Sequence, residues 1–311
     1  KFAAATGTAL DELATMEGVV SVAERYYQWT DSLTETSDDG KAFFGYDAMD
    51  NYFIIGAMQL GTEIFDSENG VGVINFDRDT IRKLWDCFYV PFVKGYYSAT
   101  GRFRSDDIKT GSAISYVGSS SSATYFPTQV IVSDSESYPI EMLTLPCPVF
   151  EGGAGYAVQQ GAGMAVTTGT EQEIRASVEF LKWFTAPENN IVFSVNSGYL
   201  PVTKDGNNVE RILSSGAEIS GSMEQVITAA VSTVNDRKLY TPAAFSGGTE
   251  ARNILKYSLL DLALADREAV LAACASGLSM DEALAPYLAD EAFDAWYAET
   301  LRQLEHCAEA S

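Results

Sequence analysis

Ser119, Ser120 and Ser121, the first three of four consecutive serines, occupy the position in this chain that most clearly indicates binding chemistry. They follow the run Ser-Ala-Ile-Ser-Tyr-Val at residues 112–117, which predicts a short strand, and precede a helix expected to begin near Ala123. Backbone N–H groups at the start of a helix are unpaired and carry partial positive charge, so they bind hydroxyl groups or anions. The serines therefore predict either a ligand-binding turn or a plain N-cap.

Aromatic and acidic side chains elsewhere in the chain could complete such a site. Tyr46 and Tyr199 could each stack a ring on the C–H face of a sugar while keeping a hydroxyl for hydrogen bonding. Asp47 and Asp50 could accept hydrogen bonds from sugar hydroxyls, because ionised carboxylates form the stronger hydrogen bonds. For each of these four residues taken alone, a structural role is an equally good interpretation.

Two consecutive helices are predicted in the stretch that leads to Tyr199. The sequence Thr-Glu-Gln-Glu at residues 170–173 is a capping box, and apolar residues then recur at helical spacing as far as residue 184. A second capping box at residues 185–188 would open the next helix, and Gly198 would end it.

Helices and strands alternate along the rest of the chain. Helices are predicted at residues 52–60 and 79–97 and in succession from residue 251 onward, and strands at residues 112–117, 141–145 and 163–167. This alternation indicates an α/β fold with three layers. Trp85 and Trp183 lie on faces of predicted helices, so we expect both in the core.

The combination of these motifs resembles a known family. The runs Phe-Leu-Lys-Trp-Phe-Thr-Ala-Pro-Glu at 180–188 and Gly-Tyr-Leu-Pro-Val at 198–202 resemble the cleft-closing signature of bacterial extracellular solute-binding proteins of carbohydrate-type ABC importers. Further motifs follow the family's order and approximate spacing: Trp-Thr-Asp at 29–31, Gly-Tyr-Asp at 45–47, Gly-Ser-Ser-Ser-Ser at 118–122, and Leu-Pro-Cys-Pro at 145–148 before Gly-Ala-Gly at 161–163. The resemblance covers nearly the whole chain.

The resemblance implies a periplasmic-binding-protein-like type II fold, in which two lobes are built from interleaved segments. Residues 1–160 would form the first segment of the C-lobe, residues 161–238 a returning segment of the N-lobe, and residues 239–311 the C-terminal helical segment of the C-lobe. The first N-lobe segment, with the signal sequence and the anchoring cysteine, would then be missing from this chain.

The same resemblance implies the function. The full-length protein would bind a carbohydrate, either a sugar or an oligosaccharide, and deliver it to the permease subunits of an ABC importer. It would be a cell-surface lipoprotein or a periplasmic protein, held at the membrane only by a lipid anchor. No enzymatic activity, cofactor or metal is implied.

Within the family, the chain is most similar to the glycerol-3-phosphate-type binding proteins, which share the serine turn and the Gly-Tyr-Leu-Pro exit. That similarity implies that Ser119 and Gly161 match ligand-contacting positions. It also implies an arginine late in the chain that holds the phosphate. The local counterpart at residues 244–248 has no arginine, and the next one is Arg252. A neutral or oligomeric sugar is therefore favoured over a phosphate ester, which stays as the alternative.

Composition excludes several other classes of function. The chain has 43 acidic and 20 basic residues, a net charge of −23, so it lacks the basic surface that nucleic-acid binding requires. The four cysteines, Cys87, Cys147, Cys274 and Cys307, lack the paired short spacing of a zinc site and are expected as buried thiols, with up to two disulfides as the alternative. A single histidine, His306, makes triad and multi-histidine metal chemistry improbable.

Two other functions stay open on the residues alone. A glycoside hydrolase needs two carboxylates about 5–10 Å apart, and a chain this acidic could supply such a pair anywhere, although no acidic residue lies in a recognisable catalytic motif. A cell-surface adhesion module is the other alternative. A binding protein is favoured over both.

Overall fold

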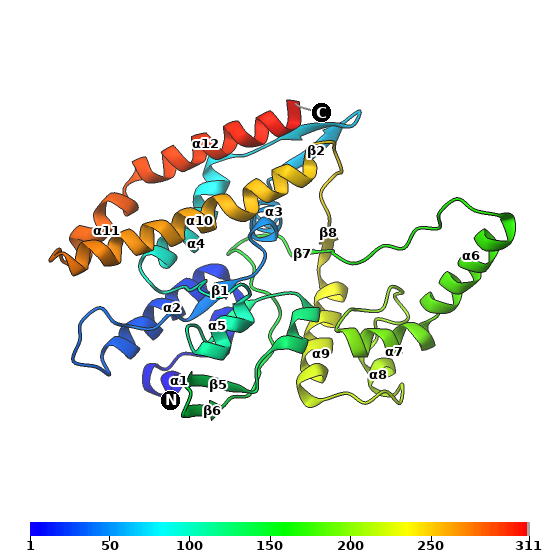
Figure 1. Ribbon diagram of the computed structural model, residues 1–311, viewed down its shortest axis with the longest axis horizontal. Helices are drawn as coiled ribbons and strands as arrows, with labels where there is room; N and C mark the ends of the chain where they lie inside the picture. The colour runs from blue at the N-terminus through cyan, green and yellow to red at the C-terminus, as the bar shows by residue number, and fades with distance from the viewer. Residues whose placement is uncertain (310–311) are drawn as a thin grey trace.

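The computed structural model describes residues 1–309, and helices are more abundant in it than strands (Figure 1). The α-helices are α1 (Phe2–Thr6), α2 (Met16–Asp31), α3 (Met49–Gln59), α4 (Arg78–Val93), α5 (Arg104–Thr110), α6 (Glu171–Thr185), α7 (Pro187–Ser197), α8 (Val209–Leu213), α9 (Gly221–Asp236), α10 (Gly248–Ala275), α11 (Met280–Leu288) and α12 (Asp290–Glu309). The 3₁₀ helices are η1 (Leu10–Ala14) and η2 (Ser120–Tyr125). In this part of the chain no helix has both the length and the apolar character that a bilayer-spanning segment needs.

The strands of the described residues pair only in twos. They are β1 (Phe44–Tyr46), β2 (Phe65–Glu68), β3 (Val71–Ile74), β4 (Ser115–Val117), β5 (Gln129–Ser133), β6 (Glu136–Pro139), β7 (Tyr156–Val158) and β8 (Lys238–Tyr240). β1 pairs with β4 and β7 with β8 in parallel, whereas β2–β3 and β5–β6 are antiparallel hairpins. The mixture of helices and strands fits the expected α/β class.

The expected layered sheet is not formed. The strand predicted at 112–117 is confirmed as β4, but residues 141–145 and 163–167 do not form strands. Strand backbone is stable only when its N–H and C=O groups pair with a neighbouring strand. These two segments therefore stay irregular, because no strand of the described chain pairs with either of them.

The main hydrophobic core lies between α2, α3, α4, α10 and α12 (Figure 1). Asp77 caps α4 by accepting a hydrogen bond from the Thr80 backbone N–H (2.9 Å), and the apolar face of this helix carries Trp85. Trp85 is 2% exposed, which confirms the prediction that it lies in the core. Its ring stacks on Tyr89 and lies 5.2 Å from the ring of Trp296 on α12. Aromatic packing of this kind ties the N-terminal and C-terminal helices into one core.

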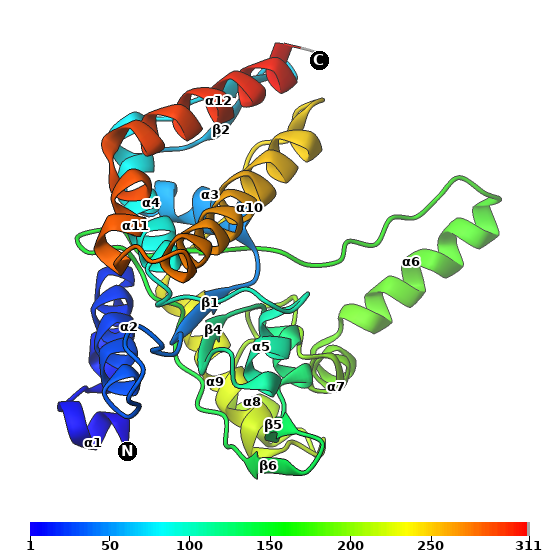
Figure 2. The ribbon, with the colours of Figure 1, turned by 60° about the vertical axis from the view of Figure 1, so that its left-hand side comes forward.

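A second, smaller hydrophobic cluster joins α7, α8 and α9. Its buried side chains are Ile191, Val195, Ile212, Ile227 and Val231. The chain reaches this region after β7 and leaves it into β8, so the parallel β7–β8 pair lies at the connection between the two regions (Figure 1). Figure 2 shows α6 standing apart from α10 and α12, at the end of a long extended segment that follows β7.

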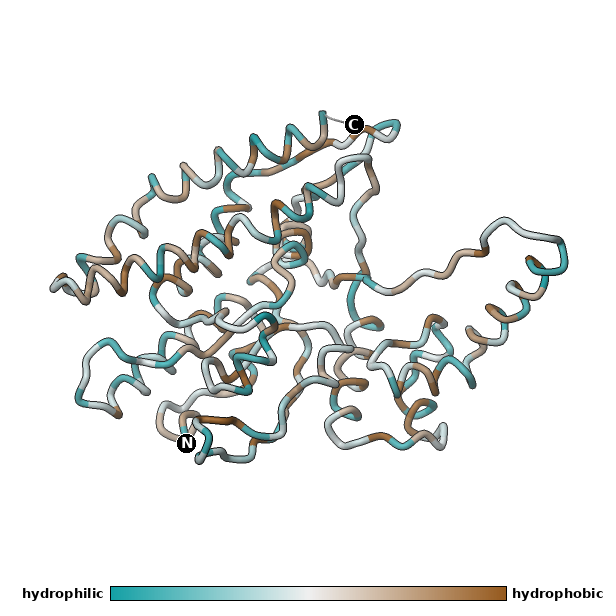
Figure 3. Tube along the Cα trace, viewed as in Figure 1, coloured by the Kyte–Doolittle hydropathy of each residue, from teal (hydrophilic) through white to brown (hydrophobic). Residues whose placement is uncertain are grey.

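Helix α6 begins as predicted but is not covered by other elements. In its capping box the Thr170 hydroxyl accepts a hydrogen bond from the Glu173 backbone N–H (3.3 Å), and the Glu173 carboxylate accepts one from the Thr170 backbone N–H (2.8 Å). Hydrophobic and hydrophilic positions alternate along the helix (Figure 3), yet none of its residues is buried. Trp183 is 58% exposed, so the prediction that it lies in the core is wrong. An amphipathic helix buries its apolar face only where another element covers it.

The second predicted capping box does not form. The N-cap of α7 is Ala186, which has no capping side chain, and the Thr185 hydroxyl donates to the Leu181 carbonyl oxygen instead (2.8 Å). Thr185 is the last residue of α6, so its hydroxyl is used within that helix. The predicted end of α7 is confirmed, because Gly198 follows it in the left-handed conformation with φ of 73°.

Candidate functional site

The parallel pair β1–β4 brings Tyr46 next to the serine turn. Tyr46 is the last residue of β1 and pairs with Val117, the last residue of β4. The Asp47 backbone N–H donates to the Val117 carbonyl oxygen (3.0 Å), so the segments that follow β1 and β4 begin side by side. Ligands of α/β proteins bind outside the carboxyl ends of parallel strands, and Tyr46, Asp47 and the turn at 118–122 all lie at this edge.

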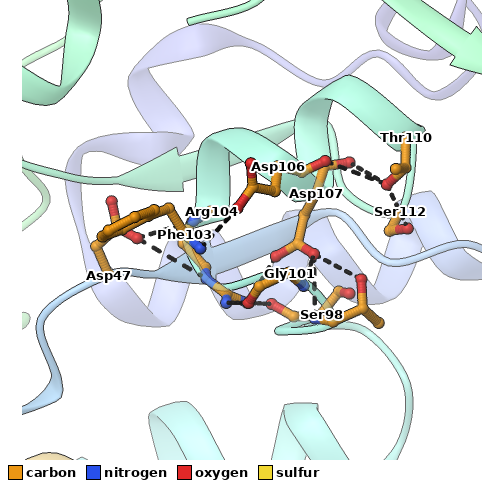
Figure 4. Close-up of polar contacts among 10 residues, drawn as sticks. Asp47, Ser98, Gly101, Phe103, Arg104, Asp106, Asp107, Thr110 and Ser112 are labelled. Atoms are coloured by element: carbon orange, nitrogen blue, oxygen red, sulfur yellow. Dashed lines mark hydrogen bonds and ion pairs between the residues drawn. The ribbon is translucent and has the colours of Figure 1, made fainter. Parts of the chain in front are cut away.

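A buried ion pair fixes the backbone beside this edge (Figure 4). The Arg104 guanidinium donates to the Ser98 carbonyl oxygen (3.0 Å) and pairs with the fully buried Asp107 carboxylate (2.6 Å). Gly45 in β1 permits this packing, since a Cβ there would lie 2.7 Å from Cδ of Arg104. The same cluster holds Asp47, whose Oδ1 accepts a hydrogen bond from the Arg104 backbone N–H (2.8 Å).

Asp47 is therefore partly committed to the fold. Its Oδ1 accepts the hydrogen bond from the Arg104 backbone N–H in the first turn of α5. Its Oδ2 faces the serine turn, 3.0 Å from where a Cβ at Gly118 would lie. Burial raises the pKa of the Asp47 carboxyl, and the hydrogen bond and charge of Arg104 oppose that rise. Only Oδ2 stays available to a ligand.

The serine turn has the geometry of an N-cap. The Ser119 hydroxyl accepts a hydrogen bond from the Ser122 backbone N–H (3.2 Å) and lies 3.0 Å from the Ser121 hydroxyl. The helix that follows is the 3₁₀ helix η2, which begins at Ser120 and not near Ala123. The first N–H groups of a helix have no partner within it, so a cap by Ser119 still leaves backbone donors at Ser120 and Ser121.

The backbone at Gly198 lies against the serine turn although the two are far apart in sequence. A Cβ added to Gly198 would lie 2.8 Å from Ser121 Cα and 3.0 Å from the Ser120 carbonyl oxygen. Only glycine fits this approach, and only glycine adopts φ of 73° without strain. Tyr199 follows directly, is 41% exposed, and has its ring 6.2 Å from that of Phe193. The fold thus brings Tyr199 to the serine turn with its ring accessible.

The Tyr46 side chain lies in a more enclosed part of the same region. Its ring packs edge-on against Tyr52 at 5.2 Å. Burial is the main cause that raises the pKa of Tyr46, followed by the neighbouring Cys147 thiol and the Asp50 carboxylate, so the hydroxyl is protonated and can donate at neutral pH. Arg237 donates to the Cys147 carbonyl oxygen (2.8 Å) and holds this segment near β8. Cys87, Cys147 and Cys274 are free thiols.

Asp50 joins a polar network that the sequence did not reveal. Its Oδ2 accepts a hydrogen bond from Nη2 of Arg252, which also donates to Asn51 Oδ1 (3.0 Å). The side-chain amides of Asn51 and Gln160 exchange two hydrogen bonds (3.0 and 3.2 Å). Arg252 is 202 residues from Asp50 in sequence, and no local pattern links them. The only signal for Asn51 in the sequence is a polar residue beside Asp50 at the start of a mostly apolar helix.

Gly161 directly follows Gln160, whose side-chain amide hydrogen-bonds Asn51 beside Asp50. It lies in the extended segment between β7 and α6, and a Cβ added to it would meet no atom within 4 Å. A cavity of about 280 Å³ lies between η2, the base of the β5–β6 hairpin and α9, and none of the predicted residues lines it. Among residues 1–309, no three His, Cys, Asp or Glu side chains converge as metal ligands would.

One comparison with known proteins places the chain in a family. No individually characterised protein matches it. A sequence profile of the bacterial extracellular solute-binding proteins matches residues 1–212, which is more than half of the chain and includes each predicted site residue. The chain belongs to the bacterial extracellular solute-binding proteins.

Proposed function

We propose that this protein binds a carbohydrate outside the cytoplasm and delivers it to the permease subunits of an ABC importer. Its family points to the binding of a small-molecule ligand for ABC import. The observation that carries the carbohydrate assignment is the meeting of three chain segments. Tyr46 at the end of β1, the serine turn after β4 and the Gly198–Tyr199 turn after α7 lie in one contiguous region.

The chemistry of these segments suits a hydroxylated ligand. The exposed ring of Tyr199 supplies a face for the C–H surface of a sugar. The backbone at Ser120 and Ser121 supplies donors, and Oδ2 of Asp47 supplies an acceptor beside them. Donors, acceptors and an aromatic face within one region are what a sugar requires, and no feature of the site calls for a cofactor.

The division of the chain into interleaved lobes is part of this proposal. The main core draws on residues before 160 and after 239, whereas the cluster of α7, α8 and α9 falls within residues 161–238. The exposed apolar face of α6 and the unpaired segments at 141–145 and 163–167 support a further segment of the N-lobe that would cover them. We propose a lipid anchor and a periplasmic or cell-surface location for the full-length protein on the family's pattern.

A glycoside hydrolase is the enzymatic alternative, and we propose that the protein is not an enzyme. The two carboxylates nearest the proposed site are engaged by the fold, Asp47 with Arg104 and Asp50 with Arg252. A hydrolase needs one carboxyl that holds a proton and one that attacks or activates water. Asp47 and Asp50 each already accept a hydrogen bond within the fold, so the proposed site does not offer the two uncommitted carboxyl groups that these roles need.

Saturation-transfer NMR with a panel of mono- and oligosaccharides tests the proposal, because it detects weak binding. We expect signal transfer to at least one sugar, and no new sugar product on prolonged incubation. The variant Tyr199→Ala should lose most of the transfer. Tyr257→Ala is the matched control, since Tyr257 is a similarly exposed tyrosine on α10 outside the site. Sugar turnover, or equal transfer in both variants, would contradict the proposal.

A further inference from the structure

The contact between Asp50 and Arg252 decides the charge of the candidate site. The two residues lie near the starts of α3 and α10, and the ion pair between them is only partly accessible, with side-chain exposures of 14% for Asp50 and 28% for Arg252. Asn51, which is 6% exposed, accepts a second hydrogen bond from the same guanidinium nitrogen. Asp50 also influences the Tyr46 hydroxyl, so the pair belongs to the same region.

The charge of the Arg252 guanidinium is neutralised by Asp50, but not all of its hydrogen-bond donors have partners. Within residues 1–309 its Nη2 alone has hydrogen-bond partners, so Nε and Nη1 could donate to an incoming ligand. Neutral hydroxyl oxygens can accept these donors without a charge penalty. A phosphate or other anion would approach the same donors beside the Asp50 carboxylate, and like charges in a partly desolvated place repel strongly.

We infer that Asp50 is a specificity-determining residue, which makes the site accept uncharged hydroxylated ligands and reject phosphate esters by neutralising Arg252. The inference rests on the proposed function, because it concerns the ligand class of the same site. It also replaces the sequence-based reason for disfavouring phosphate. Arg252 is present at the site. The carboxylate of Asp50 beside it, and not the lack of an arginine, sets the preference for uncharged ligands over phosphate esters.

The test titrates inorganic phosphate into five forms of the 311-residue chain by calorimetry: wild type, Asp50→Asn, Arg252→Gln, the double variant Asp50→Asn/Arg252→Gln, and Asp294→Asn. Asn keeps the shape of Asp50 and removes its charge. Asp294→Asn is the matched control, since it makes the same charge change at an exposed pair with Arg78. Circular dichroism confirms that each variant is folded.

We expect Asp50→Asn alone to bind phosphate on the order of tenfold more tightly than wild type, because a guanidinium without a carboxylate partner forms charge-assisted hydrogen bonds to phosphate. The double variant and Asp294→Asn should resemble wild type. A folded Asp50→Asn variant that binds phosphate no more tightly, or a gain that survives Arg252→Gln, would overturn the inference.

A comparison of wild type with Arg252→Gln tests the inference without any change at Asp50. If wild type already binds phosphate tightly and Arg252→Gln abolishes that binding, Asp50 does not exclude anions and the inference fails. Sugar binding is measured separately by saturation transfer. A wild-type chain that binds no sugar contradicts the proposed function and leaves the comparison of phosphate affinities unaffected.

Discussion

At the scale of single residues, long-range polar contacts organise the proposed site. Asp107 is fully buried and accepts hydrogen bonds from the backbone N–H groups of Thr100 (3.0 Å) and Gly101 (2.7 Å) in addition to its ion pair with Arg104. Arg104 in turn presents its backbone N–H to Asp47. The position of Asp47 at the β1–β4 edge therefore depends on a cluster that touches no ligand.

Replacing Asp107 by alanine should strongly destabilise the protein. The change removes the close carboxylate partner of the buried Arg104 and leaves only Asp47 at 3.9 Å, which costs about 3–5 kcal/mol of unfolding free energy. Urea denaturation followed by circular dichroism measures the loss. Asp294→Ala, which breaks the exposed pair with Arg78, is the control and should have a far smaller effect. Equal losses in the two variants would show that the Arg104–Asp107 pair is not desolvated.

Cys87 should resist alkylation in the native protein. Its side chain is buried, and burial raises the pKa of its thiol from 9.0 to about 12. Only the thiolate reacts, and three pKa units reduce the thiolate fraction at pH 8 roughly a thousandfold. Iodoacetamide labelling mapped by mass spectrometry should modify the partly exposed Cys274 first. Labelling of Cys87 at a comparable rate in folded protein would contradict its placement in the core.

At the scale of elements, local signals predicted more than long-range ones. The capping box at 170–173, the left-handed Gly198 and the helical periodicity around Trp85 each depend on residues within a few positions of one another, and each is confirmed. The strands expected at 141–145 and 163–167 required partners that sequence alone could not supply. Trp183 was misplaced for the same reason, because a helical face is buried only if something covers it.

The two tryptophans on predicted helix faces should behave differently when replaced. Trp85→Ala should cost about 3–5 kcal/mol of unfolding free energy, as expected for a large side chain removed from a packed core. Trp183→Ala should cost less than about 0.5 kcal/mol in the 311-residue chain, because its side chain is mostly exposed. Chemical denaturation of both variants makes the comparison. A similar loss for Trp183→Ala would mean that the apolar face of α6 is covered.

At the scale of the whole molecule, the site depends on contacts between distant parts of the chain. Tyr46 meets the serine turn through β1–β4, the turn meets Gly198, and Asp50 meets Arg252 across 202 residues. The candidate residues could be chosen from sequence because their motifs are local. Their partners could not, because Arg104 and Arg252 reach them only through contacts between distant parts of the chain. Gly161, predicted from resemblance alone, adjoins the Asp50 network through Gln160, and a Cβ added to it would meet no atom within 4 Å.

Amide chemical-shift mapping with a bound sugar tests the central claim most directly. The 311-residue chain, labelled with ¹⁵N, is titrated with the sugar that gives the strongest saturation transfer. The account predicts that the perturbed amides cluster at Tyr46 and Asp47, at Ser119, Ser120 and Ser121, and at Tyr199. Perturbations confined to the cavity between η2 and α9, or scattered over the surface, would contradict it.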